Sequence, residues 1–378
     1  MKKHAYAYIV ILLAGLCGGC LQPSASIDTF IELKGHTDSV NSAIFSPDDK
    51  KIVTGSMDGT ARIWDAKSGK ELYILEGHTD WSKSVTVDYS PDGKKIGTWE
   101  HLANTVQIWD AESGEKLHTL DGQMVHFSPD GKKVVTLNVG DGAFLIWDAE
   151  SGKELQKVSA NVFSSFGGRS PDRKKIVLNR GDITFILDFE SEKGQQMEGR
   201  FGNFSSDCKK VATISRDEII RIWDVKSGKE LLNLKGQTAN LSPNGTKIAT
   251  GNFDDTIRIC DAGSGKELHQ LEGMTGTFLP DGKKIVTADK NGITRIWDVA
   301  SGEELRQLQG EMMPVFSPDG KKMIMPYMAN KDVVKQQVWD VESGKVQKLE
   351  GIFAAFSSDG KKFVTINDDN IARIWVLE

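Results

Sequence analysis

The chain has 378 residues, of which 39% are hydrophobic and 8% aromatic, so it is long enough to bury a large core. Its formal net charge is −6, and its lysines are spread along the chain instead of forming the basic stripe that a nucleic-acid backbone requires. We therefore expect no nucleic-acid partner.

The first residues are predicted to be an export signal. Lys2 and Lys3 precede the apolar or small run from Ala5 to Leu16, which is too short to span a bilayer as a permanent helix but suits a signal peptide. We place this signal at residues 1–19 and a short tether at residues 20–26.

The end of the signal carries a processing motif. Gly18-Gly19-Cys20 resembles the box of bacterial lipoproteins, in which small residues precede a cysteine that is lipidated and becomes the mature N-terminus. Cys17 departs from that box, where leucine is usual. We expect lipidation at Cys20, with ordinary cleavage and an uncleaved anchor as alternatives.

The resemblance to lipoproteins implies a location. Acyl chains on Cys20 would hold the protein at a membrane surface. Leu21 after the cysteine favours the outer membrane, if the cell has one. The sequence therefore predicts a lipid-anchored protein of the bacterial cell envelope.

Residues 27–378 repeat one unit nine times, and its best copy reads FSPDDKKIVTGSMDGTARIWDAKSGKEL from Phe45 to Leu72. Equivalent positions near the end of the unit lie 36 to 45 residues apart and are Trp64, Trp109, Trp147, Leu187, Trp223, Cys260, Trp297, Trp339 and Trp375. A period near forty is typical of a modular array.

Each unit is predicted to be a four-stranded antiparallel meander. Alternating runs such as KKIVTGS are separated by Asp-Gly and Ser-Gly turns, and four short strands use up the whole period. One meander cannot bury both faces, so copies must stack, and a closed ring does this best. We predict an all-β fold, a single β-propeller with nine blades, with eight or seven as alternatives. The fourth and eighth copies are the most degenerate.

The ends of the chain predict how the ring closes. The last copy stops at Glu378, directly after its tryptophan, and lacks the outermost strand. Residues Ile27 to Leu33 precede Lys34-Gly35-His36 as the outermost strand precedes the next copy elsewhere. We expect this N-terminal strand to complete the last blade and remove its free edge.

These repeats resemble the WD-repeat family of propellers over roughly Ile27 to Glu378. In that family a histidine, a serine or threonine, an aspartate and a tryptophan form a hydrogen-bonded tetrad, which the resemblance places here at His36, Thr54, Asp58 and Trp64. Later copies keep only part of this set, and from the third copy onward the histidine is gone and the interblade loop is about five residues shorter.

The resemblance also implies a binding surface, because partners of WD-repeat proteins often dock on the rim formed by interblade loops. Equivalent rim positions here are Asn41, Trp81, Lys83, Arg200, Arg216 and Lys290. Trp81 is the most suggestive of them, since exposed tryptophan and arginine concentrate binding energy.

Catalytic motifs are scarce in the sequence. The histidines have no paired metal-ligand spacing, there is no nucleophile elbow, and nearly all acidic residues lie in predicted turns. We therefore predict a non-catalytic, membrane-anchored scaffold that binds a protein or peptide, with no cofactor. The alternative is an enzyme or small-ligand binder that uses the central channel. It would need ionisable groups on the innermost strands, whereas segments such as SAIF and TANL are almost wholly apolar or small.

Overall fold

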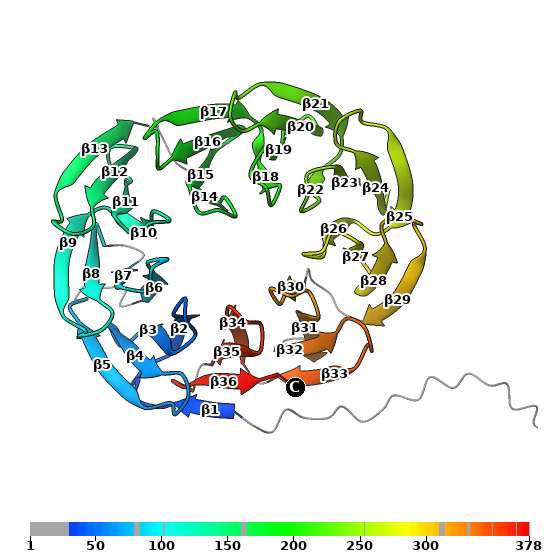
Figure 1. Cartoon of the computed structure of the whole chain (residues 1–378). Helices are drawn as coiled ribbons and strands as arrows, with labels where there is room; N and C mark the ends of the chain where they lie inside the picture. Colours follow the sequence, from blue (N-terminus) through cyan, green and yellow to red (C-terminus); the bar gives the residue numbers. More distant parts are fainter. Residues whose placement is uncertain are drawn as a thin grey trace, which may run out of the picture.

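The computed structural model describes residues 30–78, 84–100, 103–159, 165–252, 254–309, 314–330, 333–349, 351–367 and 369–377. Over these residues the chain forms strands and turns without helices, and the strands make nine four-stranded antiparallel sheets arranged as blades around one ring (Figure 1). The prediction of a nine-bladed propeller is confirmed, and the degenerate fourth and eighth copies each form a full blade.

Within each blade the strands run in chain order from the centre of the ring to its circumference (Figure 1). The innermost strands are β2 (Val40–Phe45), β6 (Val85–Tyr89), β10 (Gln123–Phe127), β14 (Ser165–Arg169), β18 (Arg200–Phe204), β22 (Thr238–Leu241), β26 (Thr275–Phe278), β30 (Val315–Phe316) and β34 (Ile352–Phe356). The second strands are β3 (Lys51–Ser56), β7 (Lys95–Glu100), β11 (Lys133–Asn138), β15 (Lys175–Arg180), β19 (Lys210–Ile214), β23 (Lys247–Gly251), β27 (Lys284–Ala288), β31 (Lys322–Asn330) and β35 (Lys362–Ile366).

The two outer strands follow in the same order. The third strands are β4 (Thr60–Asp65), β8 (Thr105–Asp110), β12 (Ala143–Asp148), β16 (Ile183–Asp188), β20 (Ile219–Asp224), β24 (Thr256–Asp261), β28 (Ile293–Asp298), β32 (Val333–Asp340) and β36 (Ala372–Val376). The outermost strands are β5 (Glu71–Glu76), β9 (Lys116–Asp121), β13 (Glu154–Ser159), β17 (Gly194–Glu198), β21 (Glu230–Lys235), β25 (Glu267–Glu272), β29 (Glu304–Gln309), β33 (Val346–Leu349) and, for the last blade, β1 (Phe30–Leu33).

Side-chain hydrogen bonds explain why the repeated turns form. In the first turn of blade 1 the Ser46 hydroxyl donates to Asp48 Oδ1 over 2.7 Å and accepts from the Lys51 amide over 2.9 Å. In the later turn, Asp65 Oδ1 accepts from both the amide and the hydroxyl of Ser68, over 2.7 and 2.6 Å. The serine and aspartate side chains thus form the hydrogen bonds that stabilise the turn, which explains why these residues recur in the repeats.

The core lies between the blades. Trp64 of blade 1, which is 1% exposed, packs in one buried cluster with Val364 and Ile374 of blade 9. Similar clusters join other neighbouring blades, for example Trp109 of blade 2 with Val53 and Ile63 of blade 1. Each sheet therefore buries its faces against its two neighbours, as a ring of blades requires.

The ring closes as the sequence predicts. Strand β1 pairs antiparallel with β36, with Phe30 opposite Trp375 and Leu33 opposite Ala372. A second contact joins the ends at the inner turns, where Asp49 of blade 1 accepts hydrogen bonds from the amide and hydroxyl of Ser358 in blade 9, over 2.7 and 2.5 Å. The N-terminal part of the predicted strand, residues 27–29, lies outside the described residues.

Candidate functional site

The meander gives the propeller two different faces. Turns between first and second strands and between third and fourth strands lie on one face, which we name the hairpin face. Turns between second and third strands, together with the loops that lead to the next blade, lie on the other, which we name the interblade face. The predicted rim residues that the structure describes belong to the interblade face, and they are Asn41, Arg200, Arg216 and Lys290.

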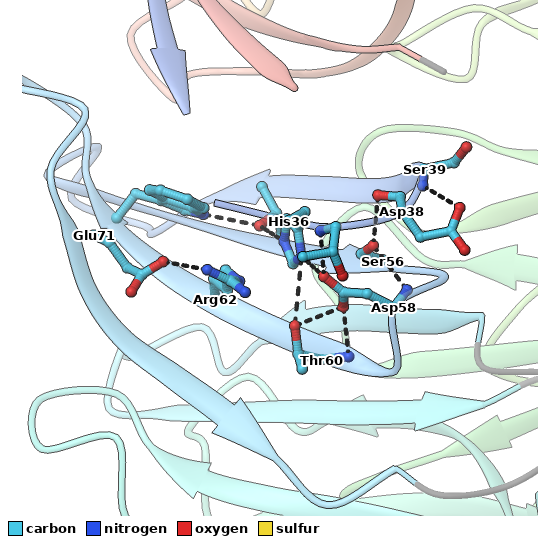
Figure 2. A network of polar contacts seen from close by, with 11 residues as sticks. His36, Asp38, Ser39, Ser56, Asp58, Thr60, Arg62 and Glu71 are labelled. Carbon is cyan, nitrogen blue, oxygen red and sulfur yellow. Dashed lines mark hydrogen bonds and ion pairs between the residues drawn. The ribbon is translucent and has the colours of Figure 1, made fainter. Parts of the chain in front are cut away.

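The predicted tetrad of blade 1 forms a continuous chain of hydrogen bonds (Figure 2). The Trp64 indole N–H donates to Thr54 Oγ1 over 2.8 Å. Thr54 Oγ1 lies 2.7 Å from His36 Nε2, and His36 Nδ1 lies 2.8 Å from Asp58 Oδ2. Since a carboxylate only accepts, Nδ1 carries the proton and Nε2 accepts from the threonine hydroxyl. This chain satisfies every buried polar group that it joins and ties the interblade loop to the blade.

Two pKa shifts result from this packing. Burial lowers the pKa of His36 below its usual value of 6.5, although Asp58 opposes that shift, so the imidazole is neutral at pH 7. Burial also acts on Asp58 and raises its pKa, but hydrogen bonds from Thr60 and the Thr37 amide outweigh it and lower the pKa to about 2. The neutral imidazole is the form that the hydrogen-bond chain requires, because it can donate from Nδ1 to Asp58 and accept at Nε2 from Thr54.

Blade 2 also contains a tetrad, whose acidic residue the sequence did not predict. His78 Nε2 lies 2.6 Å from Thr98 Oγ1, which accepts from the Trp109 indole over 2.8 Å. The carboxylate comes from Glu100, whose Oε1 lies 3.3 Å from His78 Nδ1. Glu100, at the end of β7, takes the place that Asp58 has in blade 1. Because blade 2 has no Asp-Gly turn at this point, the sequence does not reveal that the two acids are equivalent.

Blades 3, 5 and 7 keep the threonine and tryptophan but use a different acceptor. In blade 3 the Trp147 indole donates to Thr136 Oγ1 over 2.9 Å, and this hydroxyl donates to the main-chain carbonyl of Asp121 over 2.6 Å. The same 2.6 Å bond recurs in two other blades, from Thr213 to the Glu198 carbonyl and from Thr287 to the Glu272 carbonyl. The shorter interblade loop brings backbone to the place that the imidazole occupies in blade 1.

Glycine makes this close approach possible. Gly122, which follows Asp121, has φ +111°, and a Cβ there would lie 2.7 Å from Thr136 Oγ1. Glycine is the only amino acid that adopts this backbone conformation without placing a Cβ atom in so small a space. The Leu-Asp-Gly sequence that leads into blade 3 is therefore part of the substitute for histidine.

Three blades lack the tryptophan bond among the residues described, and in blade 6 the reason is that Cys260 stands at the tryptophan position, opposite Ile248. In blade 4, Leu178 and Leu187 occupy the threonine and tryptophan positions, and they pair with Phe185 and Ile176, respectively, across β15 and β16. In blade 8, Met325 occupies the threonine position and the buried Trp339 Nε1 has no hydrogen-bond partner. Blades 4 and 8 rely on apolar packing alone at this point.

The structure brings two predicted rim residues together. Arg200 at the start of β18 and Arg216 in the β19–β20 turn line one open cavity of about 470 Å³ on the interblade face of blade 5. Phe201 and Ile214 form its apolar wall. Arg216 Nε lies 3.1 Å from Asp182 Oδ2, whereas Arg200 is exposed and makes no ion pair with a described residue.

Other predicted rim residues lie elsewhere. Asn41 is at the junction of blades 1 and 2, where its amide donates to the Ser84 hydroxyl, and Lys290 pairs with Asp255 over 2.6 Å between blades 6 and 7. Trp81, Lys83 and the lipidation candidate Cys20 fall outside the described residues, so their roles stay predictions.

The channel lining corrects one expectation. The innermost strands were expected to be almost wholly apolar or small. Instead, three of them, β6, β10 and β14, carry the ionisable residues Asp88, His126 and Arg169. Arg169 Nη1 lies 2.7 Å from Asp88 Oδ2. Burial raises the pKa of Asp88, with Arg169 opposing the shift, while burial and the Arg169 charge lower the pKa of His126. Asn203 and Asn240 continue this polar row with a 3.1 Å hydrogen bond.

Membrane-spanning helices and metal clusters are both missing from the described part of the chain. None of its residues forms a helix long and apolar enough to cross a bilayer. It also contains no group of three or more histidine, cysteine, aspartate or glutamate side chains arranged to hold a metal ion.

Comparison with known proteins points to one class. The family described as "WD40: WD domain, G-beta repeat" matches residues 27–65 and 69–110, which correspond to the closing strand and the first two blades. The crystal structure of the C-terminal WD40 domain of Sif2 superposes with a TM-score of 0.56, covering 92% of this chain and 98% of that one at 15% identity. The fold is therefore that of a WD40 propeller.

Curated relatives match over the same kind of short segment. Ribosome assembly protein 4 of Chaetomium thermophilum is 45% identical over 65 residues, 17% of this chain and 12% of the relative. THO complex subunit 3 of Arabidopsis thaliana is 39% identical over 67 residues, 18% of this chain and 20% of the relative. The alignments thus span at most a fifth of these relatives. Together the matches support a WD-repeat β-propeller fold.

Proposed function

We propose that this protein is a non-catalytic scaffold, anchored to a membrane of the bacterial envelope through lipid on Cys20, that binds a protein or peptide on its interblade face. The observation that carries the binding part is the cavity of blade 5, where Arg200, Arg216 and Phe201 converge. An apolar side chain of the partner would enter the cavity, and an acidic neighbour would meet the unpaired Arg200. Exposed arginine beside an aromatic wall is the composition of interface hot spots.

The similarity to WD40 proteins supports the same assignment. Two of the matched relatives are, by name, a ribosome assembly protein and a subunit of the THO complex, so both act with other macromolecules. A rigid ring with varied loops on one face suits such a role, because loops can change without disturbing the blades.

Site-specific cross-linking tests the binding face. We expect a photoreactive residue at Gln237, which lines the cavity, to give discrete adducts in intact cells. The matched control is Lys67, an exposed residue of the β4–β5 turn on the hairpin face. Adding Arg200→Glu and Arg216→Glu should abolish the Gln237 adducts without lowering the melting temperature. Equal adducts from both faces would contradict the proposal.

Fractionation tests the anchor. We expect Cys20→Ser to move the protein from the membrane fraction to the soluble fraction, because the acyl chains would have no attachment point. Cys17→Ser is the matched control and should leave the protein in the membrane fraction. Retention of the Cys20→Ser protein with the membranes would count against lipidation.

A further inference from the structure

A second cavity lies on the opposite face, at the hairpin-face mouth of the channel. Its volume is about 370 Å³, and its walls come from the ends of the innermost strands of blades 9, 1 and 2, with Phe356, Phe45 and Tyr89 as the largest side chains. A space of this size with aromatic walls suits a small organic ligand. It is separate from the cavity of blade 5, so a ligand bound here is independent of the partner in the proposed function.

One cation reaches this cavity from a different part of the ring. Arg173 belongs to the first turn of blade 4, yet it lines the cavity together with residues of blades 9, 1 and 2. Its side chain is half-buried and makes no ion pair or side-chain hydrogen bond with a described residue. A guanidinium at a cavity with aromatic walls, where it forms no ion pair with a described residue, is a ready partner for an anion.

The nearby acids are hydrogen-bonded to groups other than Arg173, although the Arg173 charge also acts on Asp88 and opposes the rise that burial causes in its pKa. Asp88 Oδ2 is occupied by Arg169, and Asp88 Oδ1 accepts from the Tyr89 amide over 3.0 Å. Asp49, which also lines the cavity, uses both carboxylate oxygens to accept the closure bonds from Ser358. Both carboxylates are therefore committed to holding the ring together.

The cavity also contains an unused hydrogen-bond donor. Tyr89 is 2% exposed, and its buried hydroxyl has no hydrogen-bond partner among the described residues. Leaving a buried hydroxyl unbonded costs about 1 to 3 kcal/mol, so such groups in native proteins usually meet a partner. Tyr89 and Arg173 line the same cavity.

We propose that this mouth binds a small apolar carboxylate, whose carboxylate group is held by Arg173 and whose hydrocarbon body packs against Phe45 and Phe356. The same chemistry is present in a free aromatic or aliphatic acid and in the C-terminal residue of a peptide. Asp49 forms the far wall and disfavours a dianion.

Arg173 occupies a position that other blades give to glycine. The equivalent turn residue is glycine with positive φ in six blades, at Gly93, Gly131, Gly245, Gly282, Gly320 and Gly360. Arg173 has φ +57°, and so Arg173→Gly should remove the cation while making the turn easier to form. The matched control is Cys208, which has φ +56° in the same turn of blade 5 and does not line the cavity.

Calorimetric titration of the full chain with 4-phenylbutanoate and with its amide tests the proposal. We expect saturable binding of the acid only. Arg173→Gly should weaken it at least about tenfold, as expected for loss of a charge-assisted contact, while raising the melting temperature. Cys208→Gly should raise the melting temperature and leave the affinity unchanged.

A second titration identifies the source of the ligand. Acetyl-Gly-Gly-Phe with a free C-terminus, compared with its C-terminal amide, should bind more tightly than 4-phenylbutanoate if the natural ligand is a peptide end, and more weakly if it is a free acid. Three results would overturn the proposal. These are equal binding of acid and amide, full affinity in Arg173→Gly, and no saturation by either acid.

Discussion

Blades 1 and 3 solve the same problem in two ways. In both, a tryptophan of the third strand donates to a threonine of the second strand, and the threonine hydroxyl needs an acceptor. Blade 1 supplies the Nε2 atom of His36 from a long interblade loop, and blade 3 supplies the Asp121 carbonyl from a loop about five residues shorter. The threonine hydroxyl therefore needs an acceptor, but this acceptor can be an imidazole nitrogen or a main-chain carbonyl. A shorter interblade loop places the carbonyl where the imidazole lies in blade 1.

The stability of the two blades depends on different groups. The histidine solution depends on titratable groups and on a packed imidazole, whereas the carbonyl solution depends on Gly122 and its backbone conformation. Blade 8 has neither, because Met325 stands where threonine would be. Substitutions in different blades should therefore lower the stability of the protein for different physical reasons.

The largest effect is expected for Trp64→Ala. Removing a side chain that is 1% exposed, together with its hydrogen bond to Thr54, should lower the free energy of unfolding by about 3 to 5 kcal/mol. Trp339→Ala is the matched control and should cost less, since Trp339 is partly exposed and its Nε1 has no partner among the described residues. Denaturant unfolding measures both, and equal losses would contradict a special role for the tetrad.

The next effect is expected for Gly122→Ala. The new Cβ would lie 2.7 Å from Thr136 Oγ1 at φ +111°, so the variant should lose about 1 to 3 kcal/mol of unfolding free energy. The control is Gly181→Ala, at φ +54° with no atom within 4 Å of the added carbon, which should lose only the backbone component of about 1 kcal/mol. If both variants lose the same amount, the close approach to Thr136 is not a constraint.

The smallest effect is expected from pH. Because the pKa of His36 is lower in the folded protein than its usual 6.5, the unfolded chain binds the proton first. The corresponding stability is present above about pH 6.5 and is lost as the pH falls toward the folded value. Asp58, with a pKa of about 2, adds a second loss between about pH 4 and pH 2.

His36→Gln isolates the first of these losses. The free energy of unfolding, measured in urea at pH 7.5 and pH 5.5, should fall more for the natural protein than for the variant. Blade 3 contributes nothing to this difference, because its carbonyl acceptor does not titrate. An identical pH dependence in the two proteins would show that His36 is not held neutral.

Much of the fold could be predicted because each repeat carries its own local instructions. The turn serines and aspartates, the alternating strands and the regular spacing of the tryptophans predicted nine blades, and the missing last strand predicted the closure by β1. The tetrad of blade 1 was predictable from its family motif. The acidic residue of the blade 2 tetrad was not, because Glu100 lies on a strand and not in an Asp-Gly turn.

The features that escaped prediction depend on contacts between blades. No pattern marks the Asp121 carbonyl as a hydrogen-bond acceptor, since every residue has one. The pairing of Asp88 with Arg169 joins blade 2 to blade 4 across the inner strand of blade 3, and Arg173 reaches a cavity formed by three other blades.

The amino-acid sequence alone determined the repeat, the strands, the turns and the strand that closes the ring, because these depend on interactions within about forty residues or on simple edge matching. The tertiary structure alone decided which groups of different blades meet, namely the arginines of the two cavities and the polar row of the channel. The physical reason is that those distances depend on the size and closure of the ring, to which all nine blades contribute together.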